Sequence, residues 1–350
     1  MKFRKIGFMC LLIIVFTGLA FPAVSTTAYA AEYNWKIQST WGRGDLSMQT
    51  LAYFAQRVFE RSHGKIKLEV FAEPEIVPIT EVLPACSRGA IQMAQGGGAV
   101  WSMVLPFGDV LFGSLPQIWY FPHKTITEGA TLQRKWIFET NAIHIIRKEF
   151  AKKNLYWLDM HGVGPAIQLS TKEVHTLKDI KGLKIADLGG WMSQWHSALG
   201  WVPSEMLPAS EMEMALRLGT IDCLDWDMSA ITGFGWNKEA PYWVDEGLAT
   251  HCLQDILVNM DAWKSLPDDL KKAVAGAAVD YFHKINENYE GLSAQIESKV
   301  KSGEVIKSHM NDEYQKAAHK EALKLWDVAS KNDPASAALI ESIKKFRGIQ

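Results

Sequence analysis

The stretch YNWKIQSTWGRGDLSMQTLAYFAQRVFERSHGKIKLEVF, residues 33–71, decides the fold class of this chain. Apolar and polar side chains alternate over residues 33–40, which predicts a strand buried on one face. Apolar residues then recur with helical spacing over residues 47–61, and Gly64 ends that helix before a second strand at residues 66–71. A strand, a helix and a strand in succession predict a parallel pair of strands covered by a helix.

The same alternation of strands and helices continues in two groups along the chain. The first group adds a helix, a short buried strand, a long helical region and another strand, at residues 79–87, 91–94, 127–152 and 155–160. The second group has strands and helices at residues 183–185, 191–199, 212–218, 221–226 and 248–259, and two long helical segments follow at residues 267–300 and 311–346. We therefore expect an α/β fold of two lobes with mainly parallel sheets and long helices near the C-terminus.

Two lobes joined by extended crossings predict a hinge that closes over a ligand in the cleft between them. We assign residues 31–156 and 247–275 to the first lobe and residues 157–246 and 276–350 to the second. The segment at residues 161–165 contains two glycines and a proline, so we expect a loop there, where the chain crosses between the lobes.

Residues 1–30 have the composition of an export signal. Three basic residues among the first five precede an uncharged apolar run, and Ala28-Tyr29-Ala30 presents the small-x-small pattern that signal peptidase cleaves. The apolar run is also long enough for an uncleaved anchor, but a glycine and a proline within it argue against that alternative. We expect cleavage after Ala30 and export to the periplasm.

Composition excludes several classes of protein. The 350 residues carry 37 basic and 39 acidic side chains, so the chain lacks the positive surplus that nucleic acid requires. Three cysteines follow the predicted signal without a CxxC motif or a His/Cys cluster, which permits one internal disulfide at most and supports neither a redox site nor a zinc site. No GxSxG or HExxH motif is present, so we expect a binding protein, with an exported hydrolase as the weaker alternative.

Several short stretches, in the family's own order, resemble the substrate-binding proteins of TRAP (tripartite ATP-independent periplasmic) transporters, the DctP family. They are SRGAIQM at residues 87–93, LKDIKGLKI at 177–185, ALRLGTID at 215–222 and VNMDAWKSLP at 258–267. A finer similarity is to the branch that binds 2-oxo acids and related monocarboxylates. It lies in EIVPITEV at residues 75–82, MVLPFG at 103–108 and GTIDCLDW at 219–226.

The resemblance implies a two-lobed, hinge-closing periplasmic binding protein fold of the type II kind. Such a receptor captures a small organic solute and delivers it to the small and large integral-membrane subunits of a permease. The same fold also serves sensory receptors, which remain an alternative. Some relatives pair through a C-terminal helix, and the helical tail at residues 311–346 permits a homodimer of that kind.

The chain departs from the family where the ligand is usually held. The family has an arginine directly after the LKI stretch, where its guanidinium forms a bidentate bond with the ligand carboxylate. Ala186 stands at that position here. The aromatic loop of the 2-oxo acid branch is reduced to Gly98-Ala99-Val100-Trp101, which keeps only the tryptophan. We therefore expect a pocket that is wider and less basic than the family norm.

Carboxylates and indoles gather around this altered position. The candidate ligand-binding residues are Trp41, Arg43, Trp101, Gln168, Asp187, Trp191, Asp225, Trp226 and Trp236. No cofactor is certain from the sequence. The resemblance implies that Gln168, Asp225 and the Trp226 carbonyl hold a metal ion beside the ligand, and Ca²⁺ or Na⁺ suits such oxygen donors.

Three interpretations of these residues stay open. In the first, the bound cation bridges Asp225 to a carboxylate ligand and replaces the lost arginine. In the second, the acids and indoles bind an amine or quaternary ammonium through cation–π contacts. In the third, Trp191 is core, Asp187 caps the following helix, and the ligand is neutral or is held by another arginine such as Arg43. Removal of Asp225 should abolish binding in the first two cases and spare it in the third.

Overall fold

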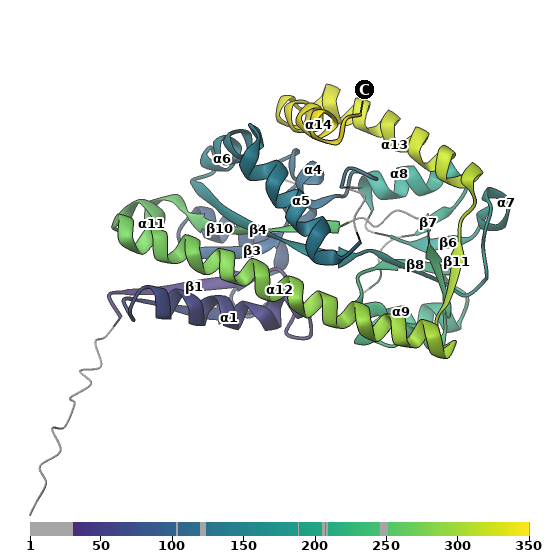
Figure 1. Ribbon diagram of the computed structural model, residues 1–350, viewed down its shortest axis with the longest axis horizontal. Coiled ribbons are helices and arrows are strands. Elements are labelled where there is room, and N and C mark those ends of the chain that lie inside the picture. Colours follow the sequence, from purple (N-terminus) through teal and green to yellow (C-terminus); the bar gives the residue numbers. More distant parts are fainter. Residues whose placement is uncertain are drawn as a thin grey trace, which may run out of the picture.

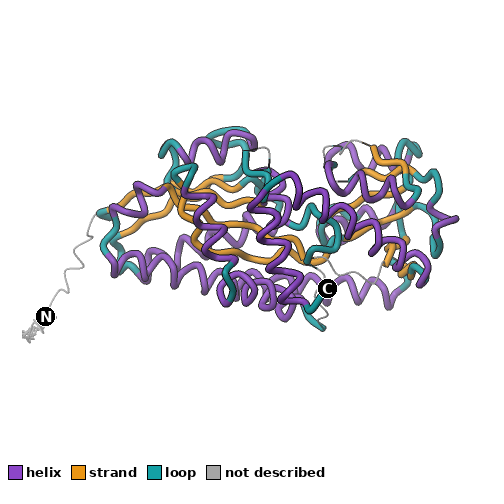
Figure 2. Tube along the Cα trace, turned by 90° about the horizontal axis from the view of Figure 1, so that it is seen from above, coloured by secondary structure: helices purple, strands orange, loops and turns teal. Residues whose placement is uncertain are grey.

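The computed structural model describes residues 31–349, apart from residues 103, 120–123, 188, 205–206, 208 and 246–250. The predicted signal peptide, residues 1–30, lies outside the described residues. The chain forms two α/β lobes that lie side by side along its longest axis, and a long helix runs past both of them (Figure 1). Seen from above, the strands form two separate groups, each flanked by helices (Figure 2).

The first lobe is built on a five-stranded mixed sheet. Its strand order is β2 (Ile66–Phe71), β1 (Tyr33–Ser39), β3 (Met93–Gly97), β10 (His251–Asn259) and β4 (Leu155–Pro165). Strand β1 is parallel to β2 and β3, as the opening stretch predicts, whereas β10 is antiparallel to β3 and β4. The expectation of a mainly parallel sheet is wrong here, because the chain inserts β10 in the middle of the sheet on its way back from the second lobe.

The segment at residues 161–165 is strand rather than the loop that we expected. It continues β4, and His251, Leu253 and Gln254 of β10 pair with Pro165, Gly162 and His161. The predicted helical region 127–152 is also interrupted, because it forms α5 (Ile126–Glu139) and α6 (Ala142–Ala151). At this break the Thr140 hydroxyl accepts the Ala142 N–H at 3.1 Å, which starts a new helix.

Short helices complete the first lobe around this sheet. α1 (Leu46–Arg61) begins at Asp45, whose carboxylate accepts the Ser47 N–H at 2.8 Å. The remaining helices of this lobe are η1 (Ile79–Glu81), α2 (Val82–Ser87), α3 (Gly98–Trp101), α4 (Gly108–Phe112) and α11 (Met260–Ser265).

The second lobe contains a six-stranded mixed sheet. The order is β11 (Ile306–His309), β9 (Tyr242–Asp245), β5 (Ile167–Ser170), β8 (Cys223–Trp226), β6 (Lys184–Ala186) and β7 (Val202–Ser204). Its helices are α7 (Leu177–Ile180), α8 (Gly190–Leu199), α9 (Ala209–Arg217), α10 (Ser229–Thr232) and η2 (Trp236–Lys238). Strands β5 and β8 are antiparallel, and their register sets Gln168 opposite Asp225.

Three helices after β10 tie the lobes together. The 35-residue α12 (Asp268–Ser302) packs on α1 and β4 in the first lobe and on α10 in the second. α13 (Asp312–Asn332) packs on α8 of the second lobe, whereas α14 (Pro334–Arg347) packs on α6 and α4 of the first. Strand β4 thus stays in the first sheet beyond our predicted boundary at residue 156, and the last helix packs on the first lobe. Among the described residues, no helix has the length and apolarity needed to cross a membrane.

Candidate ligand-binding site

Acidic side chains from both lobes meet where α1 begins and β8 ends. Asp45 belongs to the first lobe, and Asp227 directly follows β8 in the second. Burial and the nearby charge of Asp227 raise the pKa of Asp45 to about 7. Burial also raises the pKa of Asp227, although hydrogen bonds from Ser229 lower it. Each lobe therefore contributes an acidic side chain to the junction, and the charge of Asp227 acts on Asp45 across it.

Two further side chains, Cys252 and Tyr289, have pKa values raised in part by the acids at this junction. Burial, then Asp225 and Asp227, raise the pKa of the Cys252 thiol to about 12, although Cys252 lies on β10 in the first lobe. Tyr289 of α12 also has a raised pKa, caused by burial and then by Asp45 and Asp227. Its hydroxyl lies 3.2 Å from the Ser47 hydroxyl. The site between the lobes is therefore rich in acidic side chains.

Gln168 and Asp225 form a buried pair in the second sheet. Directly opposed residues on antiparallel strands place their side chains on the same face. Gln168 is 5% exposed and Asp225 is 2% exposed. The Gln168 amide nitrogen lies 3.0 Å from His196 Nε2, while its amide oxygen has no hydrogen-bond partner among the described residues. A buried oxygen of this kind suits a cation or a ligand donor, because an unsatisfied buried acceptor is costly.

Asp187 is fully buried at the start of α8. One of its oxygens accepts the Gly189 N–H at 2.8 Å and the Ser193 hydroxyl at 2.6 Å, and the other bonds to His196 Nδ1 at 2.7 Å. Burial alone would raise the pKa of Asp187, but the hydrogen bond and charge of His196, with the other donors, lower it below the usual value. Asp187 is thus an ionised carboxylate that anchors the helix start.

Aromatic rings lie beside the end of β8. The Trp226 and Trp236 rings meet edge to face with centroids 5.4 Å apart, and Phe234 stacks on Trp236 at 4.5 Å. Trp191 reaches across the cleft, since its indole N–H donates to Asp109 of α4 at 3.1 Å. Trp41, after β1, is partly buried, and its indole N–H has no hydrogen-bond partner in the part of the chain that the structure describes.

Two of the predicted residues are engaged elsewhere. Arg43 forms a two-point ion pair with Glu75, at 2.5 and 2.8 Å, and its side chain is 67% exposed. Trp101 is fully buried in the first lobe beside Asp255. Burial raises the pKa of Asp255 to about 7, against the hydrogen bond that it accepts from the Trp157 indole. The structure thus brings Gln168, Asp225 and Trp226 together, while Arg43 is paired with Glu75 and Trp101 lies beside Asp255.

Two residues of this site were absent from the sequence-based set. Asp45 lies two positions after Arg43. The only sequence feature that marks it is its position just before the apolar helical pattern of residues 47–61. His196 has no metal-like spacing to another histidine, so no pattern pointed to it. Its contact with Gln168 depends on the packing of α8 against β5.

The donor set fits a hard cation. The Gln168 amide oxygen, the Asp225 carboxylate and the Trp226 carbonyl are oxygen donors of the kind that Ca²⁺ accepts. Within the described part of the chain, no three or more His, Cys, Asp or Glu side chains lie close enough to hold a metal on their own. Any cation held here therefore needs amide, carbonyl or ligand oxygens as well. Cys86, Cys223 and Cys252 are free thiols.

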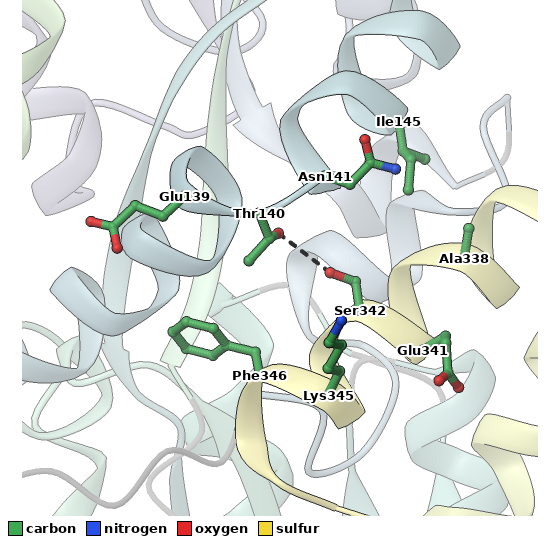
Figure 3. A pocket seen from close by; sticks show the side chains of 9 residues that line it. All are labelled: Glu139, Thr140, Asn141, Ile145, Ala338, Glu341, Ser342, Lys345 and Phe346. Carbon is green, nitrogen blue, oxygen red and sulfur yellow. Dashed lines mark hydrogen bonds between the residues drawn. The ribbon is translucent and has the colours of Figure 1, made fainter.

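A separate cavity of about 680 Å³ lies on the first lobe, away from these residues (Figure 3). It opens between the junction of α5 with α6 and one face of α14. The Thr140 and Ser342 hydroxyls lie 3.3 Å apart beside it. None of the candidate ligand-binding residues lines this cavity.

Comparison with known proteins identifies the family. Residues 37–332 match the sequence profile of the bacterial extracellular solute-binding proteins, family 7 (DctP). This chain belongs to that family. A periplasmic protein of Nostoc sp., named as binding monocarboxylate 2-oxoacids, is 25% identical over 335 residues, or 92% of this chain and 86% of that protein. The resemblance to TRAP solute-binding proteins is thereby confirmed, and family 7 consists of receptors rather than enzymes.

Solved structures share the fold of this family 7 protein. A TRAP periplasmic solute-binding protein of Colwellia psychrerythraea, with bound calcium and pyruvate, has a TM-score of 0.78 at 21% identity and covers 90% of this chain and 94% of its own. One from Chromohalobacter salexigens, with bound (S)-(+)-2-amino-1-propanol, has a TM-score of 0.74 at 20% identity and covers 91% of this chain and 96% of its own. The predicted two-lobed periplasmic binding fold is confirmed.

Proposed function

We propose that this protein is the periplasmic receptor of a TRAP transporter. It captures a small organic acid between its lobes and delivers it to the small and large permease subunits. Cleavage near Ala30 releases it into the periplasm, where it binds its solute without turnover. The observation that carries this proposal is the buried Gln168–Asp225 pair at the lobe junction of a family 7 fold.

A Ca²⁺ or Na⁺ ion bound by Gln168, Asp225 and the Trp226 carbonyl holds the ligand carboxylate. Ala186 removes the guanidinium that would pair with an acid directly. Asp45, Asp225 and Asp227 are acids at this junction, and a bare carboxylate would be repelled by whichever of them is ionised. A cation supplies the missing positive charge and leaves coordination sites for the ligand oxygens. The Nostoc and Colwellia proteins support this ligand class, since one is named for 2-oxoacids and the other holds pyruvate with calcium.

An amine is the second candidate ligand. Asp45 and Asp227 come from different lobes and interact electrostatically, and Trp226 directly precedes Asp227 in the chain. An ammonium group placed between two carboxylates and an indole would be held by ion pairing and cation–π attraction. The Chromohalobacter structure, which contains an amino alcohol, shows that this fold accommodates such a molecule.

Thermal melting of the mature chain distinguishes the two ligands. Pyruvate with Ca²⁺ or Na⁺ should raise the melting temperature, and a chelator should reverse the calcium effect. Ligand at about 100 times its dissociation constant stabilises the folded state by about 2.7 kcal/mol. A shift with 2-amino-1-propanol that ignores metal would instead favour the amine.

A substitution separates specific binding from general ion effects. Asp225→Asn should abolish the shift produced by calcium with pyruvate, because it removes the charged ligand of the cation. Asp327→Asn is the matched control, since that carboxylate lies exposed on α13. Retention of the full shift in Asp225→Asn would refute the proposed cation site. Pyruvate uptake that requires the permease genes would distinguish transport from sensing.

A further inference from the structure

We propose that Asp187 and His196 are positioning residues that hold the Gln168 amide with its oxygen directed to the proposed cation. This inference rests on the proposed function, because it assigns the amide oxygen to the cation site. Asp187, His196 and Gln168 form one hydrogen-bonded chain from α8 to β5, and none is more than 5% exposed. Solvent therefore does not compete for these bonds.

Asp187 sets which atoms donate and which accept along this series of hydrogen bonds. Its first oxygen is occupied by the Gly189 N–H and the Ser193 hydroxyl. Its second oxygen faces His196 Nδ1 at 2.7 Å, and an ionised carboxylate only accepts hydrogen bonds. Nδ1 must therefore carry a proton. The Trp195 and Trp201 rings pack against the imidazole, with centroids 5.2 and 6.2 Å away, which restricts its rotation.

The His196 imidazole in turn fixes the orientation of the Gln168 amide. The Gln168 amide nitrogen can only donate a hydrogen bond, so the ring nitrogen that faces it, His196 Nε2, is the acceptor. It lies 3.0 Å from the Gln168 amide nitrogen, which donates to it. The opposite amide orientation would set two acceptors against each other at this distance. Within the described part of the protein, the amide oxygen is consequently left without a hydrogen-bond partner, on the face of the sheet that it shares with Asp225.

This arrangement determines which ion the site favours. An outward oxygen coordinates a cation, whereas an outward NH₂ group would donate to an anion directly. A glutamine without such a chain could present either group. The residue that sets the choice, Asp187, directly follows Ala186, where the family arginine is absent. Asp187 and His196 therefore commit the site to a cation-mediated mode of carboxylate binding.

Asp187→Asn is the sharpest test because asparagine has the shape of aspartate but should exchange donor and acceptor at each hydrogen bond between residues 187, 196 and 168. The Gly189 N–H needs an acceptor, so the new amide oxygen should remain beside it. The new NH₂ group then faces His196 Nδ1, which becomes an acceptor, and the proton moves to Nε2. Gln168 must turn its oxygen inward to accept this proton. Calcium affinity measured by titration calorimetry in the presence of pyruvate should fall about tenfold or more.

A second substitution provides a rescue that a merely structural role would not. In Asp187→Asn combined with Gln168→Glu, one glutamate oxygen accepts the His196 Nε2 proton and the other remains for the cation. Calcium affinity should recover in this double variant. Asp179→Asn is the matched control, since Asp179 also caps a helix of the second lobe, α7, but has no contact with Gln168. It should leave calcium affinity unchanged.

The ¹⁵N chemical shifts of His196 in the cation-free protein test the proposed hydrogen-bond directions independently of calcium binding. Wild type should show the Nδ1-protonated tautomer, and Asp187→Asn the Nε2-protonated one. An Nε2-protonated or doubly protonated His196 in wild type would overturn the inference, and so would undiminished calcium affinity in Asp187→Asn. If the tautomers switch but wild type binds neither Ca²⁺ nor Na⁺, the proposed cation site is refuted and with it the role assigned to Asp187, while the tautomer result stands.

Discussion

At the scale of single residues, the raised pKa of Asp45 at the lobe junction makes the free energy of unfolding depend on pH. Burial and Asp227 raise its folded-state pKa to about 7, against about 3.9 when unfolded. The folded protein therefore binds more protons between pH 4 and 7, so this group makes the free energy of unfolding decrease as pH rises through that window. Asp45→Asn removes this loss, and asparagine is an equally good N-cap.

We expect Asp45→Asn to match wild type near pH 4 and to exceed it at pH 8 by about 4 kcal/mol, since each pKa unit between the folded and unfolded states corresponds to about 1.4 kcal/mol. Urea unfolding at both pH values measures the difference. A variant that is less stable than wild type at pH 8 would contradict this account.

The sequence alone predicts some residues of the candidate site and misses others. Gln168, Asp225 and Trp226 were predicted because the resemblance carries them, and the structure brings them together at the lobe junction. Their assignment to a metal ion stays a prediction. Asp45 and His196 lack such a signal, because their significance arises only in the folded protein: the charge of Asp227 in the second lobe acts on Asp45 in the first, and His196 meets Gln168 within the second lobe.

At the scale of helices and strands, periodic patterns located most elements, and long-range pairing explains the exceptions. Residues 161–165 contain glycine and proline and resemble a loop locally. They are strand because β10, nearly a hundred residues later, pairs with them. The mixed sheets have the same origin, since pairing of returning strands is not encoded in any local window.

Helix α8 provides the prediction at this scale. Its Trp191 donates to Asp109 of α4, which joins the two lobes across the cleft. Trp191→Phe keeps an aromatic ring but removes the donor. One hydrogen bond contributes about 0.5–1.5 kcal/mol, so ligand affinity should fall roughly two- to tenfold if this bond strengthens on closure. Titration calorimetry measures the affinity, and the melting temperature of the ligand-free protein serves as the control. Unchanged affinity would mean that the bond does not favour the closed state.

At the scale of the whole molecule, both lobes contact the same long helix. One core cluster is continuous past α12, from Leu51 and Tyr281 in the first lobe to Leu224 and Ile231 in the second. The packing of α12 therefore connects the two lobes through one continuous apolar cluster. α13 and α14 add a second connection on the opposite side, because one packs on each lobe (Figure 1).

Charge across the cleft predicts how closure is controlled. Asp45 and Asp227 lie on different lobes and repel each other when both are ionised. A bound cation with its carboxylate ligand should relieve this repulsion and draw the lobes together. Small-angle scattering of the mature chain should therefore show a smaller radius of gyration with calcium and pyruvate together than with either alone. Asp225→Asn should stay extended under the same conditions, and Asp327→Asn should contract like wild type. Contraction of Asp225→Asn to the wild-type value would show that closure does not depend on the cation at Asp225.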